Sequence, residues 1–567
     1  MRRCLVTAVL AFVILAMLAP PAFAQAPAGP PAPKVTITGT FDQITSAGRN
    51  FYDGNFARDN DREWYARTRF RPDFEFAVGR TKAVLAIELD LMYGQGGSND
   101  GGFPGNNSGQ PGGFAGGTKS ATGGGLDINT DVAGLFEIKW IYTEFDLTGK
   151  DSLLPFIPIL TVARAGGQPF GTIANYKVYY ANGDFAGLDL YSTFTPDIKN
   201  HLAYVIVEDQ LAGGNRTAAA QNRTNRGEDY AFIISPEFTP FKGLDLKPMF
   251  SWFHADGLTS GSSRRNAFNQ RTSGGTMNGV AAYAGATPAG AAAAGGDATY
   301  HEERYTVGLD ARWRVGPFGL DPTISYQWGA YDTQALSNTT GAAQKVRGDA
   351  SAWLFDVIGS YQLGPLLLEM RGTYSTGNKA RDNLSLSKRY YEPLDLDTGF
   401  WSGGWLGILG LGVDYFNGGG GANIGMDTNV GYDRYGRGSF ALRGTYSLTP
   451  ALSFYGVVSP NWTAEKVDTN TGCPALNVST SALGCTSRVA VAGSGRPSFA
   501  EGDSSYLGTE VNGGFTWRFA PNAAFDLAGY YLFAGSAMDQ AESLNGVIVK
   551  RDARDGYYAA ARVRLSF

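Results

Sequence analysis

The sequence predicts an all-β protein, a transmembrane antiparallel β-barrel of eighteen strands with short periplasmic turns and long extracellular loops; 16 or 20 strands are the alternatives. Apolar and polar side chains alternate along segments of about 9 to 14 residues, the length that crosses a membrane as a tilted strand. After the first residues no apolar run reaches the roughly 18 residues of a membrane-crossing helix. Glycine makes up 77 of the 567 residues, and the mean hydropathy is slightly polar. Both properties fit a barrel wall with one apolar face and one water-facing face.

The chain begins with the pattern of an export signal. Arg2 and Arg3 precede an apolar run from Leu5 to Leu18, and Ala22-Phe23-Ala24 supplies a cleavage motif. An Ala/Pro-rich stretch, QAPAGPPAPK, follows as a periplasmic tether. The predicted domains are therefore a cleaved signal peptide at 1–24, the tether at 25–34 and the barrel at 35–567.

One early strand shows why the charged face must point inward. In WYARTRFRPDFEFAV, residues 64–78, Arg67, Arg69 and Arg71 alternate with aromatic side chains, as on a strand whose successive side chains point to opposite faces. An arginine on the lipid face near the midplane would cost about 2–4 kcal/mol. The arginines are therefore expected to face the lumen, and the rings to face lipid.

The same alternation defines the strands in order, with KVTITGTFDQ, AVLAIELDLMY and ERYTVGLDARWRV as clear examples. A weak candidate at 405–416 is assigned to the loop 376–435, because a barrel with both termini in the periplasm needs an even number of strands. A second strand near 421–433 would raise the number to 20. The predicted strands are 35–44, 63–78, 83–93, 135–147, 157–166, 185–195, 201–208, 229–239, 243–254, 302–315, 319–331, 350–363, 365–375, 436–448, 451–463, 505–519, 523–534 and 556–567.

Connections alternate between short and long, which is the asymmetry of turns and outer loops in membrane barrels. Tight turns such as GRTK at 79–82 alternate with long Gly/Asn/Ser stretches. The third long connection, 166–184, carries Lys177, Tyr179 and Asp184 and is the candidate for a loop that folds inward and constricts the lumen. The second and fifth loops are longer and are the alternative.

Part of the inner-wall charge is expected to be structural. Opposed charges across neighbouring strands are each worth a fraction of a kcal/mol and keep the wall from repelling itself. Pairing across the short turns places Arg71 near Asp90, Arg314 near Asp321 and Asp356 near Arg371.

Arg67 and Arg69 differ, because their expected cross-strand neighbours are Gly94 and Met92. Unpaired basic groups along a narrow aqueous path attract anions and repel cations. The basic and acidic side chains that are expected to face the lumen roughly balance one another. This predicts that the selectivity for anions is mild and is set locally. The candidate pore-lining residues are Arg67, Arg69, Arg71, Glu88, Asp90, Arg304, Arg312, Arg314, Glu369, Arg371, Arg443, Glu510 and Arg518.

The chain ends with YYAARVRLSF, an alternating strand that stops on Phe567. Together with the export signal, this ending resembles that of Gram-negative outer-membrane β-barrel proteins. The resemblance implies a place in the cell outer membrane, contact with its lipid and lipopolysaccharide, and recognition of Phe567 as an insertion signal by the barrel-insertion machinery. Homotrimers are common among porins, but no segment of this sequence specifies one.

Other residue types point to little further chemistry. Cys473 and Cys485 share the loop 464–504 and are predicted to form a disulfide, with a metal pair as the minority alternative. The three histidines show no zinc spacing, so neither a metal nor a cofactor is expected, and an enzyme is not expected either. A net charge of −5 argues against a nucleic-acid partner.

The hairpin at 506–535, YLGTEVNGGFTWRFAPNAAFDLAGYYLFAG, resembles the corresponding hairpin of the alginate-export family of eighteen-stranded barrels. That resemblance implies an arginine-lined lumen that exports an anionic polysaccharide, and the nearly balanced lumen charge departs from it. The sequence therefore predicts a porin, a passive diffusion channel for small hydrophilic solutes or ions with a mild preference for anions. The alternatives are an exporter of anionic polysaccharide and a plugged structural or adhesive surface barrel.

Overall fold

The computed structural model of the chain describes residues 32–50, 62–93, 131–132, 136–181, 184–209, 228–256, 301–336, 343–379, 387–394, 405–409, 435–467, 469, 502–544 and 547–567. Most of these residues lie in strands. Within the described part of the chain, no helix has the length and apolar character needed to cross a membrane. The predicted signal peptide and most of the tether lie outside it and stay predictions.

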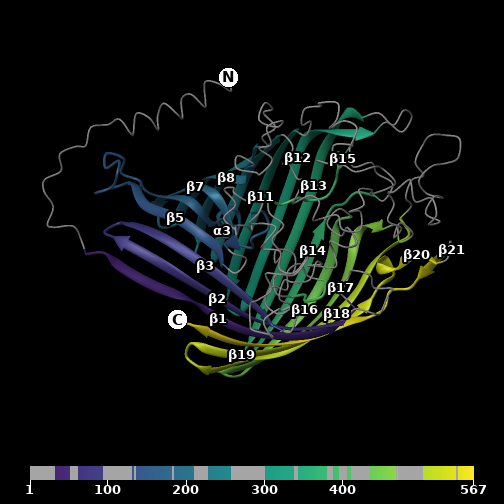
Figure 1. Ribbon diagram of the computed structural model, residues 1–567. Helices are drawn as coiled ribbons and strands as arrows, with labels where there is room; N and C mark the ends of the chain where they lie inside the picture. Colours follow the sequence, from purple (N-terminus) through teal and green to yellow (C-terminus); the bar gives the residue numbers. More distant parts are fainter. Residues whose placement is uncertain are drawn as a thin grey trace.

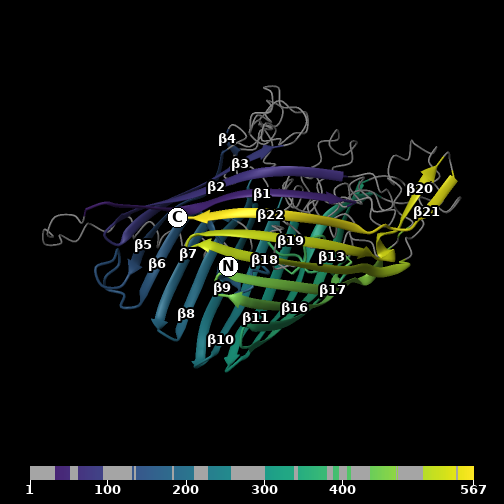
Figure 2. The same ribbon diagram turned by 90° about the horizontal axis from the view of Figure 1, so that it is seen from below.

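Eighteen antiparallel strands form one closed barrel, as predicted (Figure 1, Figure 2). Each strand pairs with the next along the chain, and the last pairs back with the first, from Thr40 opposite Ser566 to Arg49 opposite Tyr557. The barrel strands are β1 (Lys34–Arg49), β2 (Arg62–Val78), β3 (Thr81–Tyr93), β5 (Phe136–Thr148), β6 (Leu160–Pro169), β7 (Asp184–Thr195), β8 (Ile198–Asp209), β9 (Glu228–Phe241), β10 (Leu244–Asp256), β11 (His301–Val315), β12 (Phe318–Leu336), β13 (Ala343–Leu363), β14 (Leu366–Ser375), β16 (Arg437–Thr449), β17 (Leu452–Val467), β18 (Ser504–Ala520), β19 (Ala523–Ala534) and β22 (Gly556–Ser566).

A few short elements lie outside this wall. Two-residue strands pair with it at β4 (Asp131–Val132) and β15 (Ser387–Lys388), and a separate hairpin is formed by β20 (Gln540–Leu544) and β21 (Val547–Arg551). Figure 2 shows this yellow hairpin projecting from the end of the barrel wall. The short helices are α3 (Gly171–Ala174) and η3 (Ser536–Met538).

Several strands extend beyond their predicted ends on the side of the long loops. β12 continues to Leu336 instead of 331, and β13 begins at Ala343 instead of 350. Outside the membrane both faces of a strand meet water, so the ladder continues where the alternation fades.

β6 begins at Leu160 instead of 157, because Pro158 lacks the N–H that a ladder position requires. Residues 405–409 form no strand, as expected.

The barrel wall has an apolar outer face and a polar inner face. On β13, Trp353, Phe355 and Val357 point outward and are 39%, 41% and 41% exposed, whereas the alternate residues Leu354 and Asp356 point inward and are buried. Because directly opposed residues on neighbouring strands share a face, the same division continues around the barrel.

Aromatic side chains mark two levels of the outer face. Near the long-loop ends, one row crosses five neighbouring strands through the directly opposed residues Tyr204, Phe232, Trp252, Tyr305 and Trp328. Toward the short turns, Phe318 packs on Tyr361 with ring centroids 4.7 Å apart. An apolar band bounded by aromatic side chains is the lipid-facing surface of a membrane barrel. The chain is therefore a transmembrane barrel.

The buried core lies inside the barrel, where segments of the long connections fold inward onto the wall. Phe170, Tyr179 and Tyr180 from the connection between β6 and β7 are at most 1% exposed and cluster with inner-wall residues of β7–β13. Trp405 and Leu409 form a second cluster with residues of β16–β19 and β22. Wall side chains alone leave the interior of a barrel this large unfilled, and these segments occupy part of it.

Candidate functional site in the barrel lumen

The turn between β2 and β3 sets the partners of the first arginines. It contains two residues, Gly79 and Arg80, instead of the expected four, and Gly79 has a φ of +60° that favours glycine. The shorter turn shifts the register by two residues. Arg69 therefore lies opposite Asp90, where Met92 was expected.

Glu88 binds two of these arginines on the inner wall. Its carboxylate lies 2.9 Å from Arg69 and 2.9 Å from Arg71. The predicted pairing of Arg71 with Asp90 and the predicted absence of a partner for Arg69 are therefore wrong. The side chains of Arg67 and Asp90 lie outside the described residues, so their place on the pore wall stays a prediction.

Other predicted ion pairs are present. Arg371 Nε lies 2.8 Å from Asp356 Oδ2, and Arg314 Nη2 donates to Asp321 Oδ2 at 2.8 Å. A further pair joins Arg443 to Glu369 at 2.6 Å. Arg518 is exposed near the short turn between β18 and β19. Most of the predicted lumen arginines are thus neutralised across neighbouring strands.

The third loop connects β6 and β7, and its described residues 170–181 fold against the inner wall. Lys177 is its charged anchor: Nζ donates to Asp356 Oδ1 at 2.7 Å and to the carbonyl of Asp321 at 2.7 Å, and its backbone N–H donates to Asp310 Oδ2 at 3.0 Å. Burial lowers the pKa of Lys177, while Asp356 acts in the opposite direction. The side chain of Asp184 lies outside the described residues.

Two tyrosines continue the third loop into the wall. Tyr179 accepts a hydrogen bond from Arg371 Nη2 at 3.0 Å, and Tyr180 donates to Ser251 Oγ at 2.8 Å. Burial raises the pKa of both phenols, so both stay neutral. Asp356 accepts hydrogen bonds from Arg371 and from Thr373 as well as from Lys177, and is 2% exposed. The loop is fixed to the wall by a buried hydrogen-bonded network.

Tyr176 of the third loop has two cations near its ring. Arg312 Cζ is 4.3 Å and Lys247 Nζ is 5.3 Å from the centroid of its ring, distances at which cations are attracted to a ring face. Lys247 also donates to the carbonyl of Thr172 at 2.6 Å and to Glu237 at 2.7 Å. Burial raises the pKa of Tyr176. Lys247 is buried by these contacts, whereas Arg312 remains exposed.

A second inward segment, the strap of residues 387–394, belongs to the connection between β14 and β16. Arg304 lies 3.0 Å from Glu302 and 2.7 Å from Glu392, and Lys388 lies 3.1 Å from Glu302, so four buried charges balance one another. The strap also reaches the third loop, because the backbone N–H of Leu394 donates to the carbonyl of Tyr180 at 2.7 Å. The two segments therefore form one layer over the inner wall.

A third inward segment, residues 405–409, is attached by a single carboxylate. Glu510 is fully buried and accepts the consecutive backbone N–H groups of Gly407, Ile408 and Leu409 at 2.5, 3.0 and 2.9 Å. Asn512 donates to the carbonyl of Trp405 at 2.9 Å. Glu510 therefore lies on the inner wall, where it binds residues 407–409 and does not face open solvent.

Several lumen residues were absent from the predicted set. Lys247 lies between Leu246 and Pro248 on β10, so the strand pattern could have identified it. Glu302 lies two residues before the predicted lumen residue Arg304 on β11, so the same period of two could have identified it. Lys388 and Glu392 lie in a long connection without periodicity, and the sequence carries no signal that brings them to β11. Cys473 and Cys485 lie outside the described residues. Among the described residues, no group of three His, Cys, Asp or Glu side chains could hold a metal ion.

Comparison with known proteins gives structural likenesses alone. No family model matches the sequence, and no curated protein matches it. OccK8 (OprE) of Pseudomonas aeruginosa is 11% identical, with a TM-score of 0.44 over 94% of this chain and 98% of that chain. A BenF-like porin from Pseudomonas fluorescens Pf-5 is 11% identical, with a TM-score of 0.42 over 94% and 99%. Acinetobacter baumannii OccAB3 is 7% identical, with a TM-score of 0.40 over 94% and 99%. Scores this low transfer no function to the chain.

Proposed function

We propose that the protein is an outer-membrane porin, a passive channel for small hydrophilic solutes or ions. The observation that carries this proposal is the closed barrel with an apolar outer face and a charged inner wall, onto which the third loop is bonded. Such a wall keeps the interior hydrated, and a loop fixed inside narrows the path without closing it by itself. The apolar belt and the predicted export signal support the outer membrane as its location.

A mild preference for anions is the finer part of the proposal. Beside the third loop, the acids Asp310 and Asp356 are buried and hydrogen-bonded. Arg312 is an exposed residue whose guanidinium stacks on Tyr176 and donates to its carbonyl at 3.3 Å. An exposed cation at a narrowing raises the local concentration of anions. Acids bind most of the other described wall arginines, so the bias is expected mainly at this position.

The same charge pairing argues against an exporter of anionic polysaccharide, which would need a continuous track of unpaired arginines. The plugged barrel remains the competing function, because three inward segments are packed into the interior. The two functions differ in one property, the passage of solute.

Swelling of proteoliposomes tests the proposed function. Liposomes that contain the purified barrel should swell in isosmotic solutions of small uncharged sugars, at rates that fall as the sugar becomes larger. No swelling above that of protein-free liposomes would exclude a porin and favour a plugged barrel.

For selectivity, Arg312→Ala should shift the reversal potential in a salt gradient toward cations. Arg314→Ala, two residues along the same face and paired with Asp321, is the matched control and should shift it less.

A further inference from the structure

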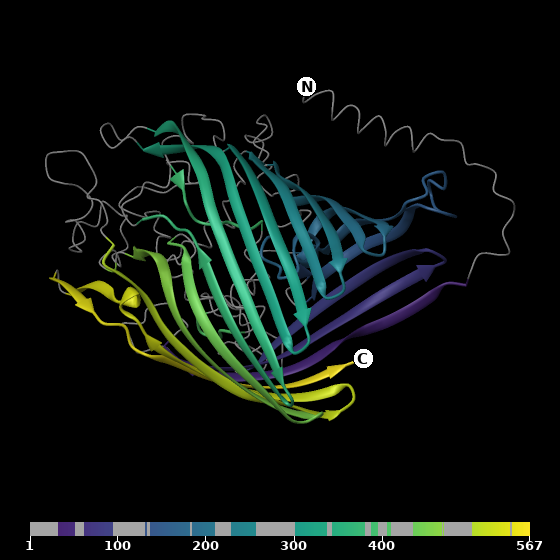
Figure 3. The ribbon, with the colours of Figure 1, turned by 180° about the vertical axis from the view of Figure 1, so that it is seen from behind.

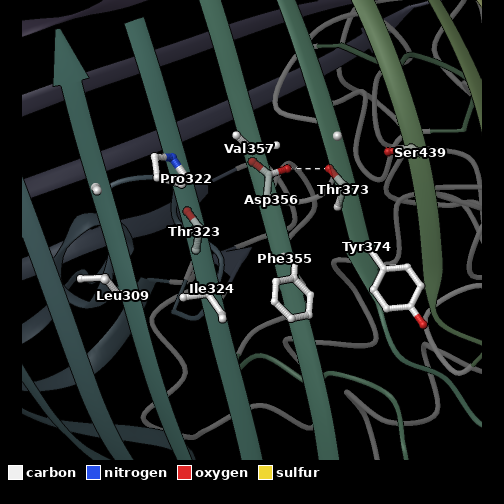
Figure 4. A pocket seen from close by; sticks show the side chains of 12 residues that line it. Leu309, Pro322, Thr323, Ile324, Phe355, Asp356, Val357, Thr373, Tyr374 and Ser439 are labelled. Atoms are coloured by element: carbon white, nitrogen blue, oxygen red, sulfur yellow. Dashed lines mark hydrogen bonds between the residues drawn. The ribbon is translucent and has the colours of Figure 1, made fainter.

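We propose that a groove on the outer face of β11–β14 binds an acyl chain of a membrane lipid. The groove has a volume of about 460 Å³, within the range of about 300–1,000 Å³ in which proteins bind small molecules. Figure 4 shows it from close by, and the teal strands that carry it form the wall seen from behind in Figure 3.

Two adjacent rows of outward side chains shape the groove. One row consists of directly opposed residues on four neighbouring strands and stands 39–46% exposed: Leu309, Ile324, Phe355 and Tyr374. The next row, toward the short turns, contains Pro322, Val357 and Gly372, with Ala311 beside them on β11. Bulky side chains thus form one wall, and the second row forms the floor, which is lowest at the small residues Ala311 and Gly372.

The floor is open because two of its positions lack bulk. Ala311 is outward-facing yet only 6% exposed, since its larger neighbours stand above it. A Cβ atom placed on Gly372 would meet only Val357 Cγ1 within 4 Å, at 3.7 Å, an ordinary van der Waals contact. A Cβ atom therefore fits at Gly372 without a clash, and a longer side chain built on it would extend into the depression.

The depth of the groove in the membrane identifies its occupant. On β12, Ile324 lies four residues from Trp328 of the aromatic row, which is about 13 Å along the strand. For a strand tilted by about 45°, this separation places Ile324 roughly 9 Å deeper in the membrane than the aromatic row. Toward the short turns, the groove ends before the Phe318–Tyr361 pair. The groove is thus continuous with the hydrocarbon-facing band, and hydrocarbon is the chemistry available to fill it.

The opposite face of the same strands makes the groove preformed. Asp356 and Thr373 point inward between the groove residues and are held by the third-loop network, in which Thr373 donates to Asp356 at 2.5 Å (Figure 4). Thr323 donates to Asp310 at 2.5 Å on the neighbouring strands. A rigid wall loses little conformational entropy on binding, so one chain should be held longer here than elsewhere on the barrel.

Photolabelling tests this site. The barrel is reconstituted in phosphatidylcholine vesicles that contain a phospholipid with a diazirine in its acyl chain, irradiated, and mapped by peptide mass spectrometry. Labels should be several-fold denser on Phe355, Val357 and Tyr374 than on Phe250 and Val307, which are equally apolar and similarly exposed at 39% each. Equal labelling of both sets would overturn the proposal.

A filled groove gives the second arm. Gly372→Leu should reduce labelling of the groove to the level of Phe250 and Val307, whereas Gly444→Leu, at an outward glycine of β16, should leave it unchanged. Unchanged labelling in Gly372→Leu contradicts an acyl-chain site. If that variant fails to fold, the photolabelling map of the wild type alone tests the proposal. A disulfide-linked dimer formed by Phe355→Cys in the same vesicles would assign the groove to a second copy of the chain and also overturn the proposal. None of these readouts depends on conductance.

Discussion

At the scale of single residues, Asp356 is where the barrel wall and the third loop are joined. Its carboxylate accepts hydrogen bonds from Lys177, Arg371 and Thr373 and is 2% exposed. Removing one partner of a buried ion pair is expensive, because the remaining charge is left buried without compensation. The position of the third loop should therefore depend on this side chain more than on any exposed ion pair of the wall.

Asp356→Asn should release the third loop from the wall. The loss of the negative charge leaves Lys177 and Arg371 facing each other, at a cost of about 3–5 kcal/mol to loop docking. Limited trypsin digestion of the folded barrel should then cut after Lys177 at least about 100-fold faster than in the wild type, since cleavage follows the population of the open form.

The matched control is Asp321→Asn. Asp321 binds Arg314, whose side chain is half exposed, and such surface pairs contribute about 0–1 kcal/mol. Cleavage after Lys177 should stay near the wild-type rate in this variant. Equal cleavage in Asp321→Asn and Asp356→Asn would contradict the role assigned to Asp356.

Glu88→Gln tests the corrected pairing on β2. One carboxylate binds both Arg69 and Arg71, so its neutralisation adds one net positive charge to this part of the inner wall. The reversal potential in a salt gradient should shift toward anions. Arg69→Ala should shift it toward cations by a similar amount. A shift of the same sign in both variants would show that these residues do not act through the charge of the pore wall.

At the scale of elements, alternation predicts which segments become strands, because each barrel strand has lipid on one face and the lumen on the other along its membrane-spanning part. It does not predict the register between strands, which depends on turn length. The turn at Gly79 and Arg80 has two residues instead of the expected four, so Arg69 lies opposite Asp90 and not opposite Met92. Nor does it predict the anchors of the inward segments. Lys388 and Glu392 come together with β11 through tertiary contacts alone, and no local pattern encodes such contacts.

The segment 405–409 should depend on the charge of Glu510. Hydrogen bonds to a charged acceptor are worth about 1.5–3 kcal/mol against about 0.5–1.5 kcal/mol for neutral ones, so Glu510→Gln should weaken each of the three N–H contacts by about 1 kcal/mol. Amide hydrogen exchange should accelerate at Gly407, Ile408 and Leu409 by at least about 5-fold. Glu369→Gln serves as the control and should leave those amides unchanged; unchanged exchange in Glu510→Gln refutes the anchor.

The seam between the first and last strands gives a prediction for Phe567. Its backbone exchanges hydrogen bonds with Gly39 at 3.0 and 3.1 Å, and its ring stacks on Phe70 with centroids 6.0 Å apart. Phe567→Ala should lower the yield of folded barrel in membranes, measured by heat-dependent mobility in gels. Phe519→Ala removes a similarly exposed ring from the end of β18 and should leave the yield unchanged. Equal losses of folded yield in both variants would mean that any exposed ring at a strand end has this effect, which would contradict a specific role of Phe567.

At the scale of the whole molecule, the barrel separates an apolar exterior from a wet interior that is partly occupied. The third loop and the strap 387–394 form one bonded layer on β7–β13, and residues 405–409 pack on the opposite arc near the seam. Charges on the inner wall and on these segments are largely paired, so the proposed selectivity depends on the few that stay exposed, such as Arg312. The fold, the strand number, the charged lumen and an inward third loop were expected from the sequence; the residues that anchor this loop and the strap 387–394 were not.

Single-channel conductance of the purified wild-type barrel in a planar lipid bilayer tests the central claim most directly. The account predicts stepwise, ohmic current increases as single barrels insert, with a conductance that scales with salt concentration and a reversal potential slightly toward anions. Insertion without any current, verified by protease protection of the inserted barrel, would contradict a porin. The inward segments would then be a plug, and the function would have to lie in the outer loops.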